Sequence, residues 1–430
     1  MSSHAVTRPL TTLAGLTATL LAAPAMADKV TIEVLQAFPG HAHFHEAVAK
    51  EFMAQNPDIE VRFRIGNGSY DETHQVMLRA AMTNRMPDVY HSGYHLLPEV
   101  VTHLAEKGKV IPLDSYIAAE ASDFVEKNYA PSLFSQWQVD GTTWGIGFNA
   151  STPIFFVNGD LVRKAGGDPD ALPDSWDGLI DLAGRISALE GDADGMAFDI
   201  HSWPDDWLWR ALIIEQGAKI MAEDGQTVAF GDTPGVKALT LAKRMVDEGG
   251  MALRDYEQSR QQFAAGQIGF IMASPNSNRS FADLVGDKFE LRTTTYPVSN
   301  KETGRIPTGG NAMMITAQDK AKQDAAWKYI KFASGPKGQE IAVLGSGYKP
   351  TNIAALAPDL LGKFYAENPN FNTTNLQIDR AAAWEGYPGT NGVEIWRAQR
   401  KIIGEVMTGA QSVEAGLAAM VETTNRLIAK

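Results

Sequence analysis

Histidines are the most unusual group of chemically capable side chains in this sequence. His41, His43 and His45 alternate, and His91 follows a short predicted strand. On a helix His41 and His45 would share one face, a spacing that can hold Zn²⁺. The alternative is that His43 and His45 lie on the solvated start of that helix and bind nothing. His41 and His91 both lie just past the carboxyl end of a strand, where α/β sheets bind ligands. We therefore expect ligand hydrogen bonds from these two imidazoles and no metal site, with zinc binding as an alternative.

Tryptophans form the second group. Trp203, Trp207 and Trp209 lie within seven residues, and Pro204 keeps Trp203 out of a regular helix. A flat indole face packs against the apolar face of a sugar ring or against a cation. Core packing is the alternative, and it suits Trp207 and Trp209 because their positions look helical. The loop position makes Trp203 a candidate wall of a ligand site, with Trp207 as a further candidate.

The motifs of several common enzyme classes are missing from the chain. We find no GxxxxGK[ST], GxGxxG, GxSxG or HExxH sequence. There is no cysteine, which excludes disulfides, thiolate metal sites and cysteine nucleophiles. Carboxylate pairs for glycoside hydrolysis stay open, because spacing in sequence does not give separation in space. We expect a binding protein without a cofactor, and the alternative is a secreted glycosidase or phosphodiesterase.

The overall charge limits the partners. The 430 residues include 38 Lys and Arg against 51 Asp and Glu, a formal net charge of −13. Such an acidic chain is a poor candidate for non-specific binding to nucleic acid or to anionic membranes. Its length predicts two or three domains.

The first 27 residues resemble an export signal. Arg8 precedes an uncharged, largely apolar stretch over 10–24, and a small-x-small sequence ends at Ala27. The stretch is too short to span a bilayer. No cysteine follows for a lipid anchor, so we expect cleavage after Ala27 and release into a Gram-negative periplasm.

Strand and helix patterns alternate behind these side chains. Apolar residues alternate over 30–34 and 59–65, as in half-buried strands, and they recur at helical spacing over 44–52 and 71–85. With a short strand at 88–90, this βαβαβ order predicts an α/β domain with a mostly parallel sheet.

A second domain begins after Gly141. Further strands are predicted at 144–148, 153–157, 270–272 and 309–315, Ser175 is a predicted helix N-cap, and the pattern is mainly helical from Ala325. No Gly-, Ser- or Pro-rich linker separates the domains, which favours several chain crossings and a hinge with a cleft. We place lobe 1 at 28–140 plus about 275–330, and lobe 2 at about 141–274 plus 331–430.

Short motifs occur in an order and spacing that resemble a known family. They are Asn56-Pro57-Asp58, Gly68-Ser69-Tyr70, Pro87-Asp88-Val89-Tyr90, Phe148-Asn149-Ala150-Ser151-Thr152-Pro153 with the following FFVNGDLVRKAGGDP, Phe263-Ala264-Ala265-Gly266-Gln267, Gly309-Gly310, Ser346-Gly347-Tyr348-Lys349-Pro350 and Met407-Thr408-Gly409. Together they resemble the extracellular solute-binding proteins of ATP-driven carbohydrate importers, in particular the glycerol-3-phosphate and glycerophosphodiester binders. The resemblance covers nearly all of the mature chain. It implies the two-lobe α/β fold of periplasmic binding proteins, with the ligand in the cleft between the lobes.

The resemblance also implies a set of ligand contacts. The corresponding residues here are Tyr70, Ser151, Trp203, Ser274, Gly310, Tyr348 and Arg397. Hydroxyls would bond the solute, Trp203 would stack, Gly310 would offer a backbone donor and Arg397 would meet an anionic group. A helix surface charge is the alternative for Arg397.

This chain departs from the glycerophosphate binders at two places. His91 stands where they have a glutamate, and Asn311 follows Gly310. A histidine can donate a hydrogen bond where a carboxylate only accepts, so the solute can differ. With His91, His41 and Trp207 added to the site, we expect a monomer that captures a sugar, glycoside or glycerophosphate-like solute. It would deliver the solute to an inner-membrane ABC permease with its ATPase.

Overall fold

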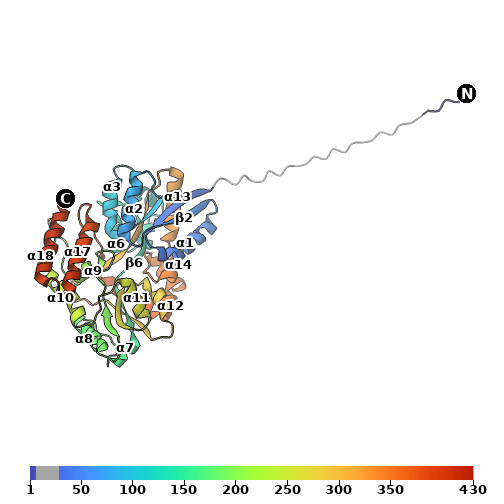
Figure 1. Cartoon of the computed structure of the whole chain (residues 1–430). Helices are drawn as coiled ribbons and strands as arrows, with labels where there is room; N and C mark the ends of the chain where they lie inside the picture. The colour runs from blue at the N-terminus through green and yellow to red at the C-terminus, as the bar shows by residue number, and fades with distance from the viewer. Residues whose placement is uncertain (6–28, 430) are drawn as a thin grey trace.

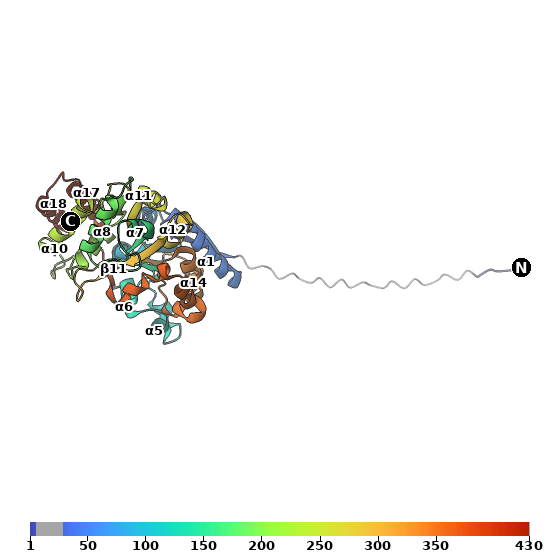
Figure 2. The same cartoon turned by 90° about the horizontal axis from the view of Figure 1, so that it is seen from below.

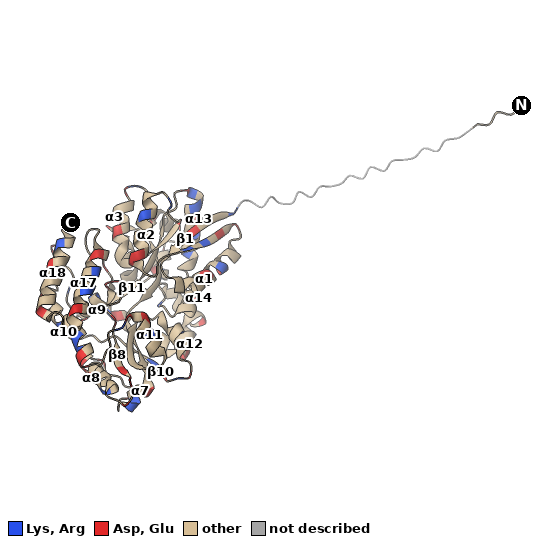
Figure 3. Ribbon diagram, viewed as in Figure 1, with Lys and Arg blue, Asp and Glu red and all other residues tan. Residues whose placement is uncertain are grey.

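The computed structural model describes residues 1–5 and 29–429, so the predicted cleavage site after Ala27 lies outside the described residues. Two β-sheets, each covered by its own helices, form two lobes (Figure 1). None of the helices in the described ranges has the length and apolar character needed to cross a bilayer. Basic and acidic residues are interspersed along the helices of both lobes in the view of Figure 3.

Lobe 1 is built on a six-stranded sheet in the order β12-β11-β3-β1-β2, with β6 paired to β11. Its strands are β1 (Val30–Gln36), β2 (Ile59–Ile65), β3 (Val89–Gly93), β6 (Ile146–Ser151), β11 (Ile306–Ile315) and β12 (Ala381–Ala383), and a small hairpin adds β4 (Gln138–Val139) and β5 (Thr142–Thr143). Strand β1 pairs in parallel with β2 and with β3, which confirms the predicted βαβαβ unit.

The helices that precede or follow these strands are α1 (Ala42–Gln55), α2 (Tyr70–Met82), α3 (Leu97–Leu104), α4 (Asp114–Ala118), α5 (Phe124–Asn128), α6 (Pro131–Phe134), α13 (Lys320–Ala333), α14 (Pro336–Ser346), α15 (Lys363–Glu367) and α16 (Pro369–Asn372). Helix α13 packs against β1 and β11, and α14 packs against α1.

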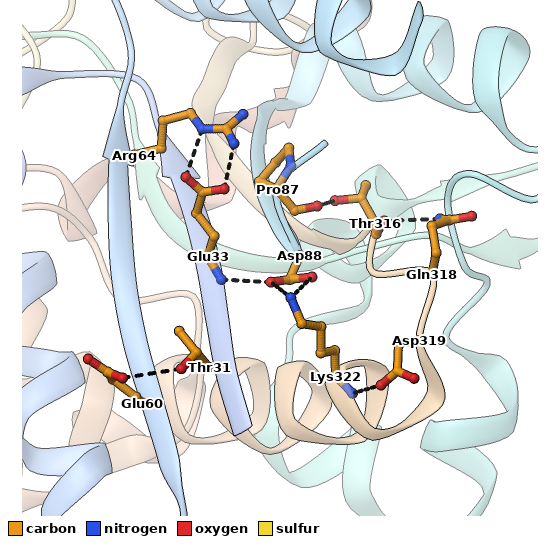
Figure 4. A network of polar contacts seen from close by, with 10 residues as sticks. All are labelled: Thr31, Glu33, Glu60, Arg64, Pro87, Asp88, Thr316, Gln318, Asp319 and Lys322. Atoms are coloured by element: carbon orange, nitrogen blue, oxygen red, sulfur yellow. Dashed lines mark hydrogen bonds and ion pairs between the residues drawn. The ribbon is translucent and has the colours of Figure 1, made fainter. Parts of the chain in front are cut away.

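A buried carboxylate fixes α13 to this sheet (Figure 4). Asp88 accepts hydrogen bonds from the backbone N–H of Glu33 at 2.8 Å and from Lys322 Nζ at 3.0 Å. Nearby, the Thr316 hydroxyl donates to the carbonyl of Pro87 at 2.8 Å. Strands β1, β3 and β11 and helix α13 are therefore joined at one point of lobe 1.

Lobe 2 contains a four-stranded sheet in the order β10-β7-β9-β8. Its elements are β7 (Ile154–Asn158), β8 (Asp194–Ala197), β9 (Ile268–Ala273), β10 (Leu291–Thr295), α7 (Gly159–Lys164), α8 (Trp176–Ser187), α9 (Trp207–Ile214), α10 (Thr233–Asp247), α11 (Tyr256–Ala264), α12 (Ser277–Val285), α17 (Gly392–Met407) and α18 (Val413–Ile428). The predicted cap of α8 is present, since Ser175 Oγ accepts from the Gly178 N–H at 3.3 Å. Helices α10, α17 and α18 lie together on one flank (Figure 1 and Figure 2).

The chain crosses between the lobes at 152–153, at 296–305 and at 384–391. These crossings do not coincide with the boundaries expected from the sequence. The segment 275–295 belongs with lobe 2, because β10 pairs with β7. The segment 141–151 belongs with lobe 1, because β6 pairs with β11, and so does 331–346, because α14 packs on α1. Local patterns contain no information on which sheet a segment joins.

Gly310 is required by the way β11 packs at the hinge. Its φ is +139°, and a Cβ at this position would lie 2.1 Å from the carbonyl oxygen of Asn149 and 2.9 Å from the Tyr94 ring. Only glycine adopts this backbone conformation without strain.

We expect Gly310→Ala to lower the free energy of unfolding by about 2 kcal/mol or more, from backbone strain and steric overlap together. Urea unfolding followed by circular dichroism measures the change. Gly40→Ala is the matched control, because nothing lies within 4 Å of a Cβ there. Equal unfolding midpoints for the two variants would contradict this account.

Candidate functional site

Tyr70 begins one wall of the space between the lobes. It is the first residue of α2, whose N-cap Ser69 accepts from the Glu72 N–H at 3.0 Å. The Tyr70 hydroxyl accepts a hydrogen bond from Asn311 Nδ2 at 3.1 Å. The N-cap therefore fixes the backbone position of Tyr70, and Asn311 of β11 fixes the position of its hydroxyl.

His91 supports this wall from behind. Its Nδ1 lies 2.8 Å from Asn311 Oδ1, which can only accept, so Nδ1 carries the proton. Burial lowers the pKa of His91 to about 4, and the neutral ring leaves Nε2 as a buried acceptor without a partner among the described residues. His91 positions Tyr70 through Asn311, a link that the motif comparison did not reveal.

Ser151 and Trp207 meet at the hinge. A Cβ on Gly309, the strand partner of Ser151, would lie 3.2 Å from Ser151 Oγ and 3.0 Å from Trp207 Nε1. The Trp207 indole donates to the carbonyl of Pro307 at 2.9 Å. The absence of a side chain at Gly309 therefore allows the indole of lobe 2 to reach β11 of lobe 1.

Trp203 forms an aromatic wall in lobe 2. Its ring centroid lies 4.7 Å from that of Tyr256 and 6.0 Å from that of Trp207. The loop is held from α17, because the Trp203 carbonyl accepts from Trp396 Nε1 at 3.0 Å and from Arg400 Nη1 at 3.1 Å. Tyr256 was not among the predicted site residues. Its position at the start of a polar helix gave no indication in the sequence that it lies beside Trp203.

Asn276 joins the two walls. Its Nδ2 donates to the Tyr348 hydroxyl at 3.2 Å and to His41 Nε2 at 3.1 Å. Burial, with the charges of His43 and Arg260, lowers the pKa of His41 to about 3, so the ring is neutral and accepts. The predicted residues His41 and Tyr348 thus meet through an asparagine that the sequence analysis did not identify.

Ser274 lies beside this contact. It directly follows β9, and its Oγ is 3.5 Å from the backbone nitrogen of Asn276. The Tyr256 hydroxyl, packed next to Trp203, lies 3.4 Å from Ser277 Oγ. Contacts therefore run without a break from Trp203 through Tyr256 and this loop to Tyr348.

Arg397 has a partner within the protein. Its Nη2 lies 3.0 Å from Glu72 Oε1, and the two side chains are 55% and 51% exposed. The pair joins α17 of lobe 2 to α2 of lobe 1 at the surface. The contact with an anionic solute stays a prediction, which requires Arg397 to leave Glu72.

His45 is buried, which excludes for this residue the alternative of a solvated helix start. Its ring stacks on Phe148 at 4.7 Å and meets His91 edge-on at 5.0 Å. Within the described part of the chain, no three His, Cys, Asp or Glu side chains gather as a metal site. His45 is a core residue of lobe 1, and α1 turns it inward because Phe44 and Val48 lie on the same buried side.

A cavity of about 210 Å³ lies between the lobes. It is bounded by the start of α3, the residue before α9 and the crossing that leads into α17. Its lining is Asp71, His95, Leu96, Pro98, Glu99, Thr102, Asp206, Gly386, Tyr387, Pro388, Gly389, Gly392 and Trp396. Asp71 directly follows Tyr70 in the chain and Asp206 directly precedes Trp207, but none of the predicted site residues lines this cavity.

Burial and nearby acids mark this region as electrostatically unusual. Burial, together with the charges of Asp71 and Asp206, raises the pKa of Asp205 to about 7, although His95 opposes the shift. None of these acids was predicted as a site residue. Aspartates at a helix start are common, so the sequence held no specific signal for them.

Known proteins share this architecture. The family of bacterial extracellular solute-binding proteins matches residues 41–340. This chain belongs to that family. It is 23% identical over 405 residues to the sn-glycerol-3-phosphate-binding periplasmic protein UgpB of Escherichia coli, with 89% of each chain covered. It is 27% identical to a putative binding protein of Brucella abortus, covering 79% of this chain and 80% of the relative.

Solved structures of binding proteins have the same fold. The GacH receptor of Streptomyces glaucescens, solved without ligand and with acarbose, superposes with a TM-score of 0.78 at 20% identity, covering 94% of this chain and 99% of that one. UgpB of Mycobacterium tuberculosis, solved with glycerophosphocholine, gives 0.77 at 18% identity, covering 93% and 98%. These likenesses confirm the two-lobe fold of this solute-binding protein.

The neutral His91 makes stability depend on pH. In the unfolded chain the imidazole takes up a proton as the pH falls below 6.5, whereas the folded chain resists protonation down to about pH 4. The contribution of the neutral His91 to the free energy of unfolding is therefore fully present above pH 6.5 and is lost as the pH falls towards 4.

From pH 7 to pH 5, the free energy of unfolding falls in both proteins. We expect the fall to be about 2 kcal/mol smaller in His91→Asn than in the native protein. Asparagine keeps a donor towards Asn311 and removes the titrating ring. Urea unfolding at several pH values measures the slope, with the more exposed His103→Asn as control. A slope equal to that of the native protein would show that His91 is not the titrating group.

Proposed function

We propose that this protein is the periplasmic component of an ABC importer and captures a sugar, glycoside or glycerophosphate-like solute in the cleft between its lobes. The observation that carries the proposal is the contact between side chains of the two lobes: Trp203 packs on Tyr256 in lobe 2, and Asn276 of lobe 2 donates to Tyr348 of lobe 1. Aromatic faces suit the apolar side of a sugar ring, and hydroxyls suit its edges. The names of the relatives support the solute classes.

Capture proceeds by closure of the lobes. The bonds from Asn276 to Tyr348 and His41, and the pair Arg397–Glu72, join the lobes in this structure. A solute that touches both walls adds contacts available only when the lobes are closed. That difference in affinity shifts the protein from open to closed. The closed form docks on the membrane permease, whose ATPase supplies the energy for transport.

Export precedes this cycle. The apolar stretch over 10–24 and the small-x-small sequence ending at Ala27 direct the chain to the periplasm, where cleavage releases the mature protein. N-terminal sequencing of the periplasmic protein tests this step, with Asp28 expected as the first residue.

A thermal-shift panel of glucose, maltose, glycerol, glycerol-3-phosphate and glycerophosphocholine tests the function. A solute with micromolar affinity, supplied at millimolar concentration, stabilises the protein by about 4 kcal/mol. Chromatography of the recovered solute distinguishes binding from hydrolysis, and we expect the solute intact. Cleaved solute would support the enzyme alternative instead.

The hydroxyl of Tyr348 lies at the contact between the lobes, so its removal weakens both closure and the bond to solute. We expect Tyr348→Phe to raise the Kd of a bound solute about tenfold, the effect of one lost hydrogen bond. Isothermal titration calorimetry measures it. Tyr329→Phe is the matched control, because that buried hydroxyl has no partner among the described residues. Equal Kd values for Tyr348→Phe and the native protein would show that the Tyr348 hydroxyl does not contribute to solute binding.

Arg397 distinguishes anionic from neutral solutes. We expect Arg397→Ala to weaken glycerol-3-phosphate at least tenfold and a neutral sugar less than twofold, because the guanidinium bonds phosphate strongly. Glu72→Gln, which frees the guanidinium from its present partner, is the companion variant. Unchanged binding of glycerol-3-phosphate by Arg397→Ala would show that Arg397 is a surface charge that does not contact the solute.

A further inference from the structure

The cavity between the lobes is lined by carboxylates and by no lysine or arginine. Asp71, Glu99 and Asp206 line it, and they are only 5%, 8% and 5% exposed. A buried carboxylate is costly unless each oxygen finds a donor or a counter-charge. The hydrogen bonds around the cavity therefore show which of its carboxylate oxygens have a donor and which do not.

Asp206 is fully partnered. Its Oδ1 accepts from Trp384 Nε1 at 2.7 Å, and its Oδ2 accepts from Arg210 Nε at 2.5 Å. Arg210 in turn lies over the Tyr387 ring, 4.5 Å from its centroid. This corner of the cavity is a completed structural contact and needs no further donor.

Asp71 and Glu99 are only half partnered. Asp71 Oδ1 accepts from His95 Nε2 at 2.9 Å, and Glu99 Oε1 lies 3.1 Å from His74 Nε2 and 3.7 Å from His103 Nε2. The second oxygen of each carboxylate accepts no hydrogen bond from the residues that the structure describes. Two free acceptors thus belong to side chains that are more than nine-tenths buried and line the same cavity.

The local charge balance is also negative. Asp205 adds a fourth buried acid beside Asp71 and Asp206, and burial raises its pKa to about 7. Against these acids stand Arg210 beside Asp206, His95 beside Asp71, and His74 and His103 beside Glu99. Burial lowers the pKa of His95, but the hydrogen bond and charge of Asp71 outweigh it and raise the pKa overall. The missing component is a donor with positive charge.

The shape and lining favour an organic cation over a metal ion. No three acidic or histidine side chains in the described ranges converge as metal ligands do. Tyr387 and Trp396 line the cavity beside the carboxylates, and aromatic rings attract organic ammonium groups. At about 210 Å³ the cavity is smaller than a whole small-molecule site, so it suits one end of a solute.

We propose that this cavity receives a positively charged amino group at one end of the transported solute. The inference rests on the proposed function and narrows its substrate class to solutes with a cationic end, such as amino sugars. Protonated amines donate to the free oxygens of Asp71 and Glu99, and the charge offsets the surplus of acids. A neutral solute can donate hydroxyl hydrogens to these oxygens, but it brings no positive charge to the acids.

Two pairs of probes test the charge directly by calorimetry on the mature protein. Glucosamine and glucose share a ring but differ in charge, and glycerophosphocholine and glycerol-3-phosphate differ by a quaternary ammonium. We expect glucosamine to bind at least tenfold more tightly than glucose. A larger gain for glucosamine points to hydrogen-bonded amine recognition, and a gain confined to glycerophosphocholine points to a quaternary cation and contradicts the amine assignment.

Variants locate the effect. We expect Glu99→Gln to reduce the cationic-to-neutral preference at least tenfold, because it removes the charge and keeps the shape. Glu106→Gln, on the exposed side just after the same helix, is the matched control and should keep the preference. Asp71→Asn is the second test if circular dichroism shows that Glu99→Gln does not fold.

The outcomes separate this inference from the proposed function. Neutral and cationic probes that bind equally would overturn the cation site and leave solute capture intact. A preference that survives both Glu99→Gln and Asp71→Asn would also overturn it. Absence of binding by every solute of the panel and both probe pairs would reject the proposed function and this inference together.

Discussion

One amide group makes two of the hydrogen bonds that join the lobes. Asn276 of lobe 2 donates both of its hydrogens to lobe 1, one to Tyr348 and one to His41. Both acceptors need specific protonation states, and burial keeps His41 neutral. The same arrangement that joins the lobes therefore also places Tyr348 opposite the loop that follows β9. In the proposed function, closure of the lobes and assembly of the binding site therefore occur together.

The polar groups near this contact are arranged in layers. Tyr70 faces the interlobe space, Asn311 holds Tyr70, and His91 holds Asn311. A neutral imidazole suits this buried position, where a carboxylate would carry an uncompensated charge. The histidine that replaces the glutamate of the glycerophosphate binders is thus compatible with its surroundings, whichever solute is bound.

Several buried acids lie where the lobes meet, between α2, α3 and the start of α9. Asp71, Glu99 and Asp206 lie there with little exposure. Buried acids that lack donors reduce stability, and they persist in proteins where binding repays the cost. Structural neighbours at about 20% identity establish the fold, but the charge of the solute has to be argued from these side chains.

The sequence by itself determined the local structure: the strands at 30–34 and 59–65, the helices between them and the Ser175 cap, because periodicity and caps act over a few residues. Its motifs also indicated the family, the two-lobe fold and several residues that meet between the lobes. Only the tertiary structure decided that 275–295 joins lobe 2, that 331–346 joins lobe 1 and that Arg397 pairs with Glu72. Asn276 and the cavity acids also emerged only there, since spacing along a chain does not fix which residues folding brings together.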